Sequence, residues 1–347
     1  MKSYKLIIII LVIFVKSGNV LSNEKIFNVN NIEISKTSKM SNEFLANKAI
    51  KVGYIQLMEK ILLSKDMKIV SDLNFKQIKE LVSYYQVIEE ENTEKENTIK
   101  FNIFFDKDKL HKLFFQRGIL YSEIIQKELF ILPILKKNDQ LYVFNNNFFY
   151  ENWNKVYSAK LIEFVLLLEN IEVIQEININ KNSLLDLNIR NLFKEYTKKN
   201  LALILIEEIQ KSNYKVYLRT NILGKKIDKN LVIEKLNLSK KDYEIKIINE
   251  VSREIINFVK SQNLIDIRVP SFLNAKLSTS KVNNLVEFNN RIKKIDSIDS
   301  IYVQEFNKSN VSLKIKYLGK LDKIMKQLEE QRIILKLIGD QWSLKLI

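Results

Sequence analysis

The spacing of hydrophobic residues changes several times along the chain, and each change predicts a new secondary-structure element. Apolar residues at three- and four-residue spacing over 46–62 predict a long N-terminal helix. Strict alternation over 99–105 predicts a strand with one buried face. Asp106 then has the position of a helix cap, and Gly118 that of a helix end. These elements predict an N-terminal α+β module over residues 23–125.

The middle of the chain, residues 126–265, alternates between strand and helix patterns. Two short apolar runs, 128–137 and 201–208, predict buried strands. Apolar positions over 153–168 predict an amphipathic helix, and Ser239 begins a capping-box pattern that opens another helix. This alternation predicts a central module built as an α/β or α+β sandwich.

The C-terminal residues 266–347 have the clearest pattern. They predict a strand over 271–279, a helix over 282–292 and a pair of strands over 300–306 and 310–319. A second helix over 321–328 and one or two closing strands over 334–346 follow. The order β-α-β-β-α-β is that of a ferredoxin-like domain. The fold class predicted for the whole chain is therefore α+β, in small mixed modules with a C-terminal ferredoxin-like domain.

The first 22 residues have the pattern of a secretory signal peptide. Lys2 and Lys5 precede an apolar run over 6–15, which is shorter than the roughly 20 residues that cross a bilayer. A polar exit and small residues follow, as in cleaved leaders. We expect cleavage between Ser22 and Asn23, export, and no transmembrane segment in the remainder. The alternative is an uncleaved anchor or a buried N-terminal strand.

Composition limits the available chemistry. The chain has 347 residues, 46% of them hydrophobic, which is enough for buried cores in two or three domains. It contains no cysteine, which excludes disulfides, thiol nucleophiles and thiolate metal sites. An exported protein of this kind must be stable through packing alone.

The net charge of +15 falls to +12 when residues 1–22, with three lysines, are removed (15 − 3 = 12). Such a surface could meet nucleic acid, phospholipid head groups or acidic polysaccharide. A chain crowded with Lys, Asn and Ile also reflects an AT-rich genome. We favour that explanation, because a selected polyanion site should be clustered rather than spread along the chain.

Several segments resemble a family of exported proteobacterial proteins called domain of unknown function 2066. The resemblance covers most of the chain after the leader. It rests on an opening helix (46–62), a Val-Ser-Tyr step (82–84) and the two ends of a helix (105–106 and 118–119). It also includes a Leu-Pro strand (132–133) and two C-terminal positions, Gly319 and Trp342. Ile and Lys stand in the opening helix where the family usually has Ala and Arg. The resemblance implies export, but the family has no assigned activity, so it carries over no functional residue.

Catalytic and cofactor signatures are missing from the sequence. His111 is the only histidine, and zinc sites and Ser-His triads need a positioned imidazole, usually with partners. We expect it to be a surface or half-buried helix residue. The six glycines do not cluster into a phosphate-binding loop. We therefore expect no catalytic, metal-binding or cofactor-binding residues and no cofactor.

Adjacent carboxylates could suggest glycoside hydrolysis. Glu89, Glu90 and Glu91 lie at a strand end beside a polar turn, where solvation is the simpler role. Glu207 and Glu208 end a buried strand, a place where ligand sites do occur in α/β sheets. We interpret them as a solvated strand end, with a ligand site as the alternative.

The strand over 311–317 predicts an open, basic sheet face. Its alternate residues Ser312, Lys314 and Lys316 share the polar side. An RNA-recognition sheet would carry aromatic residues there, so we expect no nucleic-acid partner. Lys314 and Lys316 are candidate anion-binding residues for a head group or an acidic partner, in a region with 15 basic and 9 acidic residues. The alternative, which we favour, is a solvated lysine face that discourages edge pairing.

These patterns together favour an exported periplasmic protein that binds an unknown envelope protein or anionic surface. We expect a non-enzymatic binding protein or envelope-assembly adaptor. One alternative is a carboxylate-based hydrolase of envelope polymers. Another is a peripheral protein held on anionic lipid by its basic C-terminal face.

Overall fold

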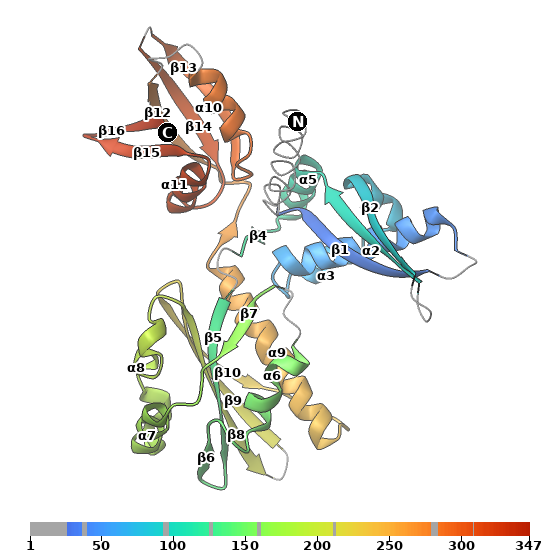
Figure 1. Ribbon diagram of the computed structural model, residues 1–347, viewed down its shortest axis with the longest axis vertical. Coiled ribbons are helices and arrows are strands. Elements are labelled where there is room, and N and C mark those ends of the chain that lie inside the picture. The colour runs from blue at the N-terminus through green and yellow to red at the C-terminus, as the bar shows by residue number, and fades with distance from the viewer. Residues whose placement is uncertain are drawn as a thin grey trace, which may run out of the picture. The chain divides into compact units, whose positions relative to one another are not determined.

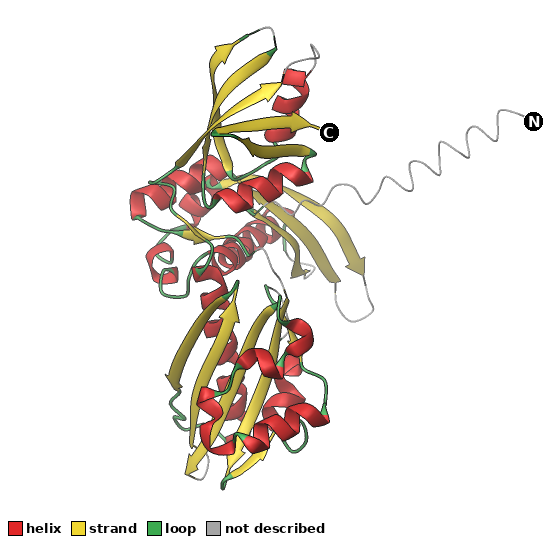
Figure 2. Cartoon of the chain, turned by 90° about the vertical axis from the view of Figure 1, so that its left-hand side faces the viewer, coloured by secondary structure: helices red, strands yellow, loops and turns green. Residues whose placement is uncertain are grey.

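The computed structural model describes residues 26–36, 40–92, 97–124, 128–157, 161–210, 213–278, 284–307 and 309–347. Helices and strands are interleaved throughout this part of the chain (Figure 2), which confirms the α+β class. The expected cleavage site at Ser22 and Asn23 lies outside the described residues. By contacts the chain forms two compact units, one with Val70–Ile119 and Asp266–Ile347 and the described residues up to Met58, the other with Glu59–Ile69 and Leu120–Ile265.

The N-terminal part of the first unit is a three-stranded antiparallel sheet with a long helix packed on one face. Its elements are β1 (Asn28–Lys36), α2 (Asn42–Ile61), α3 (Met67–Val70), α4 (Phe75–Glu80), β2 (Val82–Asn92), β3 (Asn97–Phe105) and α5 (Lys107–Arg117), with the strand order β1-β3-β2. Gly53 of α2 faces the sheet so closely that a Cβ there would lie 2.8 Å from Ile32 Cδ1. This glycine therefore lets the helix approach the sheet.

Helix α5 begins and ends where the sequence predicts. The Asp106 carboxylate accepts hydrogen bonds from the backbone N–H groups of Asp108 (3.0 Å) and Lys109 (3.1 Å). Gly118 takes the left-handed conformation with φ 64° at the other end. Asp106 is therefore a helix cap, which satisfies two of the backbone donors that every helix start leaves open.

The C-terminal part of the first unit is a five-stranded sheet with two helices. It consists of β12 (Ser271–Ser278), α10 (Asn284–Ile292), β13 (Ile298–Phe306), β14 (Asn310–Tyr317), α11 (Leu321–Glu330), β15 (Ile333–Ile338) and β16 (Gln341–Leu346). The predicted order β-α-β-β-α-β is present, and β16 is added to it. The strand order is β13-β14-β12-β16-β15, so the strand beside β12 is the added β16, which is parallel to it, and β15, which follows α11, lies at the edge. The element order is therefore ferredoxin-like, but the pairing differs, because a ferredoxin-like sheet pairs its last strand antiparallel with its first.

The second unit is built around a six-stranded mixed sheet. Its strands are β5 (Glu128–Lys137), β6 (Gln140–Tyr142), β7 (Glu163–Leu166), β8 (Asn200–Gln210), β9 (Asn213–Ile222) and β10 (Lys225–Val232). The order is β10-β9-β8-β5-β6, and β7 pairs with β5; β5 is parallel to both β7 and β8. A small separate pair joins β4 (Tyr121–Ser122) to β11 (Leu264–Ile265).

Helices cover both faces of this sheet (Figure 1). On one face lie α6 (Phe148–Val156) and α9 (Lys240–Ser261); on the other lie α7 (Ile171–Ile179), α8 (Ile189–Leu192) and the 3-10 turns η2 (Lys181–Asp186) and η3 (Lys194–Tyr196). Neighbouring residues of β8 pack into different cores: Ile204 packs on the α9 side and Leu203 on the α7 side. The predicted central sandwich is thus a three-layer arrangement.

The helix predicted over 153–168 is wrong in its second half. Helix α6 ends at Val156, and the apolar residues Phe164 and Val165 lie in strand β7, paired in parallel with β5. Phe164 and Val165 point into opposite cores, as in a strand buried on both faces. A short apolar run cannot be assigned to helix or strand by spacing alone.

Helices α7 and α8 and the turns between them occupy a stretch for which the sequence suggested no element. Their start signals are present: Asn170 caps α7 by accepting from Glu172 N (2.7 Å), and Asn188 caps α8 by accepting from Arg190 N (3.2 Å). In a chain so rich in asparagine such caps do not stand out, which is why the elements were missed.

A buried lysine holds a separate chain segment within the second unit. Lys260 of α9 is 3% exposed, and its ammonium donates to the carbonyl oxygens of Glu59 and Leu62, the latter at 2.7 Å. Asn257, one turn earlier, accepts from Ser64 N and Oγ at 3.1 Å. Burial lowers the pKa of Lys260 to about 8, and the negative charge of Glu59 acts in the opposite direction.

Candidate functional site

The C-terminal sheet has one buried face and one face that carries polar and aromatic side chains. Along β12 and β14 buried residues alternate with more exposed ones. The strand register places the more exposed set on one side. We call this side the open face; it includes Phe272, Asn274, Lys276, Ser300, Tyr302, Glu305, Ser312, Lys314, Lys316, Ile334, Lys336, Ile338, Gln341, Ser343 and Lys345.

The two lysines predicted from the sequence both lie on the open face, but their surroundings differ. Lys316 Nζ lies 2.9 Å from an Asp299 carboxylate oxygen, and this hydrogen bond raises the pKa of Lys316. Its charge is therefore compensated within the protein. Lys314 instead lies over the ring of Phe272, with Nζ 4.6 Å from the ring centroid. Its ammonium makes a cation–π contact and remains available to an anion.

The open face also carries aromatic residues that the sequence argument missed. Phe272 is 51% exposed and Tyr302 is 50% exposed. Phe272 is opposite Lys316 in the ladder, and Tyr302 is opposite Lys314. The expectation of a face with only serine and lysine was therefore wrong, because it considered one strand without its neighbours. The alternation within 271–279 and 300–306 was the signal that could have revealed both rings.

Most of the lysines on this face have no carboxylate partner among the described residues. Lys276, Lys336 and Lys345 form no ion pair with any residue that the structure describes. Two acidic residues lie on the same side: Asp299 pairs with Lys316, and Glu305 accepts a hydrogen bond from the Asn307 amide at 3.0 Å. The open face therefore combines uncompensated positive charge with two exposed rings.

The carboxylates considered for hydrolysis do not face each other. Glu207 lies 2.9 Å from Lys136 Nζ, and Glu208 lies 3.4 Å from Lys137 Nζ. As neighbours on β8 they point to opposite sides of the sheet. Each is thus paired across strands with a lysine of β5. The side chains of Glu89, Glu90 and Glu91 lie outside the described residues.

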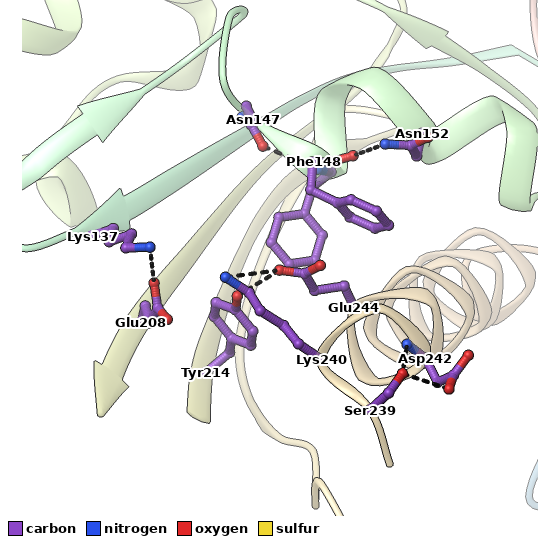
Figure 3. A network of polar contacts seen from close by, with 11 residues as sticks. Lys137, Asn147, Phe148, Asn152, Glu208, Tyr214, Ser239, Lys240, Asp242 and Glu244 are labelled. Atoms are coloured by element: carbon purple, nitrogen blue, oxygen red, sulfur yellow. Dashed lines mark hydrogen bonds and ion pairs between the residues drawn. The ribbon is translucent and has the colours of Figure 1, made fainter. Parts of the chain in front are cut away.

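A buried carboxylate, that of Glu244, lies on the α9 side of the same sheet (Figure 3). The Tyr214 hydroxyl donates to Glu244 Oε1 at 2.7 Å, and Lys240 Nζ lies 3.8 Å from the same carboxylate. Burial, and then the hydrogen bond to Glu244, raises the pKa of Tyr214. The phenol therefore stays protonated and acts as a donor, and the group connects α9 to β9 rather than providing a base.

His111 lies on α5 at the edge of a shallow cleft within the first unit. The cleft has a volume of about 310 Å³, and its lining includes His111, Phe115, Asp299 and Lys316. The imidazole makes an edge-to-face contact with Phe27, with ring centroids 5.6 Å apart. Burial, together with the charge of Lys107, lowers the pKa of His111 to about 4. The ring is therefore neutral at pH 7, as expected of a half-buried helix residue.

The described residues contain no group of three or more His, Cys, Asp or Glu side chains that could hold a metal ion. In the same part of the chain, none of the helices combines the length and the apolar character needed to cross a bilayer.

Comparison with known proteins leaves the chain without a family. No family model matches it, and no curated protein does. Solved structures do match, among them one described as the crystal structure of an uncharacterized protein, at 9% identity and a TM-score of 0.18. That match covers 41% of this chain and 94% of the other chain. The resemblance to domain of unknown function 2066 stays a prediction.

Proposed function

We propose that this is an exported periplasmic protein that works by binding, and that the open face of its C-terminal sheet recognises an acidic segment of a partner protein. The observation that carries the proposal is the pairing of exposed rings with uncompensated lysines on one sheet face. Phe272 and Tyr302 supply apolar contact area, while Lys276 and Lys314 supply positive charge beside them. Aromatic residues with a charged rim are typical of protein interfaces.

A protein partner accounts for this face better than a lipid surface. Phe272 and Tyr302 lie within strands β12 and β13, not at a loop tip from which a ring could enter a bilayer. An extended sheet face instead suits a broad partner surface. Lysines spaced across the strands complement an acidic segment and increase its rate of association.

The hydrolase alternative has less support. Retaining and inverting glycosidases need two carboxyl groups on either side of the scissile bond. Glu207 and Glu208 lie on opposite sides of β8, and each is paired with a lysine. Glu244 is engaged by Tyr214 and Lys240.

Site-specific photocrosslinking in intact cells tests the binding proposal. A photoreactive phenylalanine analogue at position 272 samples the open face, and the same analogue at Val286 of α10 is the control. Val286 is 63% exposed and lies on a helix rather than on the open face. We expect a discrete protein adduct from position 272 and none of that size from position 286.

Each other outcome of this experiment contradicts part of the proposal. The same adducts from both positions would mean that the open face has no special role. Adducts of position 272 with lipid or nucleic acid alone would replace the acidic protein by another anionic partner.

Export is tested separately by mass spectrometry of the natural protein. We expect the chain to begin at Asn23 and to fractionate with periplasmic contents. A chain that keeps Met1 and fractionates with the cytosol would contradict export without bearing on the open face.

A further inference from the structure

A second, independent feature lies in the second unit, where the β9–β10 hairpin meets the η2–α8 segment. A polar cavity of about 170 Å³ lies there. Its lining includes Asp186, Asn188, Arg190, Arg219, Asn221, Lys226 and Asp228. The cavity thus gathers three cationic and two anionic side chains, a balance of 3 − 2 = +1, with two amides.

The lining of the cavity contains an amide, that of Asn221, with no partner among the described residues. Asn221 is 3% exposed, and its side chain forms no hydrogen bond with any residue that the structure describes. Its amide is not among the fully enclosed polar atoms that lack a partner, which agrees with an amide that opens into the cavity. Because Asn221 lines the cavity, the partner it lacks can come from a molecule held there.

Arg219 fixes the walls of the cavity relative to each other. It lies two residues from Asn221 on β9 and therefore on the same side of the sheet. Its Nη1 donates to the Leu187 carbonyl at 2.7 Å, and its Nε lies 3.6 Å from Asp228. The guanidinium thus ties the loop between η2 and α8 to the strand, which preorganises the cavity before any ligand arrives.

The lining also provides charged groups that no described residue compensates. Arg190 and Lys226 form no ion pair with any residue in the described part of the chain, and the Asp186 carboxylate also has no partner there. Lys226 is directly opposite Asn221 in the β9–β10 ladder, so both side chains lie on one side of the sheet. Two cations, one carboxylate and one amide thus remain for a ligand.

We propose that this cavity binds a small hydroxylated anion, a molecule with one phosphate or carboxylate group and neighbouring hydroxyl groups. Arginine and lysine suit the oxygen atoms of such an anion. Asp186 accepts from the hydroxyl groups, and Asn221 both donates and accepts. The volume equals that of about five or six waters at roughly 30 Å³ each, which fits a three-carbon phosphate or acid.

Isothermal titration of the full chain with four probes tests the ligand class. The probes are glycerol 3-phosphate, glycerate, glycerol and inorganic phosphate. We expect binding of one or both of the first two, and binding at least about tenfold weaker for glycerol and for phosphate. The first two probes distinguish a phosphate from a carboxylate as the anionic group.

A matched pair of lysine substitutions tests the position of the site. Lys226→Gln removes a cation of the cavity lining, and Lys225→Gln removes the same charge one residue earlier. Lys225 is opposite Ile222, whose side chain belongs to the α9-side core, so it points to the other side of the sheet. We expect Lys226→Gln to weaken binding at least about tenfold and Lys225→Gln to leave it unchanged within about twofold.

Asn221→Leu separates a binding role from a structural one. A leucine of similar size removes an amide that has no protein partner. The melting temperature of the unligated chain should therefore stay the same or rise, while binding is lost. A lower melting temperature would show that Asn221 stabilises the fold, which contradicts the site.

Two further results would overturn the proposal. One is the absence of a binding heat for every anion at concentrations up to about 100 mM, where even weak specific binding is detectable. The other is equal affinity of the natural chain and the Lys226→Gln and Asn221→Leu variants.

Discussion

The two largest sheets of the molecule use their faces differently. In the six-stranded sheet, all residues of β8 from Leu201 to Ile206 are at most 7% exposed, because helices cover both sides. In the five-stranded sheet, Val311, Leu313 and Ile315 of β14 are buried, while Ser312 and Lys314 between them are not. The central strand of one sheet is core from Leu201 to Ile206, whereas the other sheet keeps one of its faces accessible.

The difference is visible in the side chains themselves. A strand with two covered faces reads LALILI, and a strand with one covered face reads VSLKIK. A binding surface can be left only on the second kind of strand. In the six-stranded sheet, polar function is confined to its ends and edges, where the cavity beside Asn221 lies.

The largest effect expected from this contrast is in the core of β8. Leu203→Ala and Ile204→Ala should each lower the free energy of unfolding by about 2–5 kcal/mol, because each removes buried methyl groups from a different core. Urea unfolding followed by circular dichroism measures both. A neutral result for either residue would mean that its face of the sheet is not packed.

The next largest effect is expected from the buried lysine of the second unit, Lys260. The pKa of Lys260 is about 8 in the fold and 10.5 in the unfolded chain, so the unfolded chain holds more protons between these values. Stability should therefore rise with pH over this window, by at most about 3 kcal/mol. Urea unfolding of the natural chain and of Lys260→Met is measured from pH 7.5 to 10, and the two midpoints are compared at each pH. A difference between the midpoints that does not change with pH would contradict this prediction.

A smaller effect of the same kind tests the first unit in acid. The pKa of His111 is about 4 in the fold and 6.5 when unfolded. Stability from this residue is present above pH 6.5 and is lost as pH falls through 4, by about 1–2 kcal/mol once solvent screening of the half-buried ring is considered. Thermal melts of the natural chain and of His111→Gln at pH 7 and 4.5 should diverge. Equal shifts in both proteins would rule this effect out.

The smallest effects are expected on the open face. Lys276→Ala and Lys314→Ala should change the free energy of unfolding by no more than about 0.5 kcal/mol, since they remove no buried contact or paired charge. Leu313→Ala, one residue away on the buried face, is the matched control and should cost about 2–5 kcal/mol. Similar losses for both kinds of residue would show that the open face is packed rather than free.

Much of the fold could be predicted from periodicity and caps. The alternation over 99–105, the cap at Asp106, the end at Gly118 and the C-terminal element order all follow from local rules that the structure confirms. The error at 153–168 came from an apolar run too short to distinguish a helix from a strand. Spacing in one segment also cannot show that β16 lies between β12 and β15, because strand pairing is non-local.

The candidate site was predictable only in part. Lys314 and Lys316 were found because alternation places them on one side of a single strand. That Asp299 compensates Lys316, and that Phe272 lies beneath Lys314, depends on neighbouring strands and their register. The polar cavity joins residues 186–190 to residues 219–228, a contact that no local pattern encodes.

The most direct test of the open face is the affinity of the full chain for a fluorescent glutamate-rich peptide, measured by anisotropy at two salt concentrations. Lys276→Glu with Lys314→Glu reverses two charges on the open face; Lys293→Glu with Lys294→Glu reverses two exposed charges just after α10. We expect the first variant to bind at least about tenfold more weakly and the second to bind like the natural chain. An equal loss of affinity in both variants would show that binding depends only on the net charge of the protein. That result would contradict a binding site on the open face.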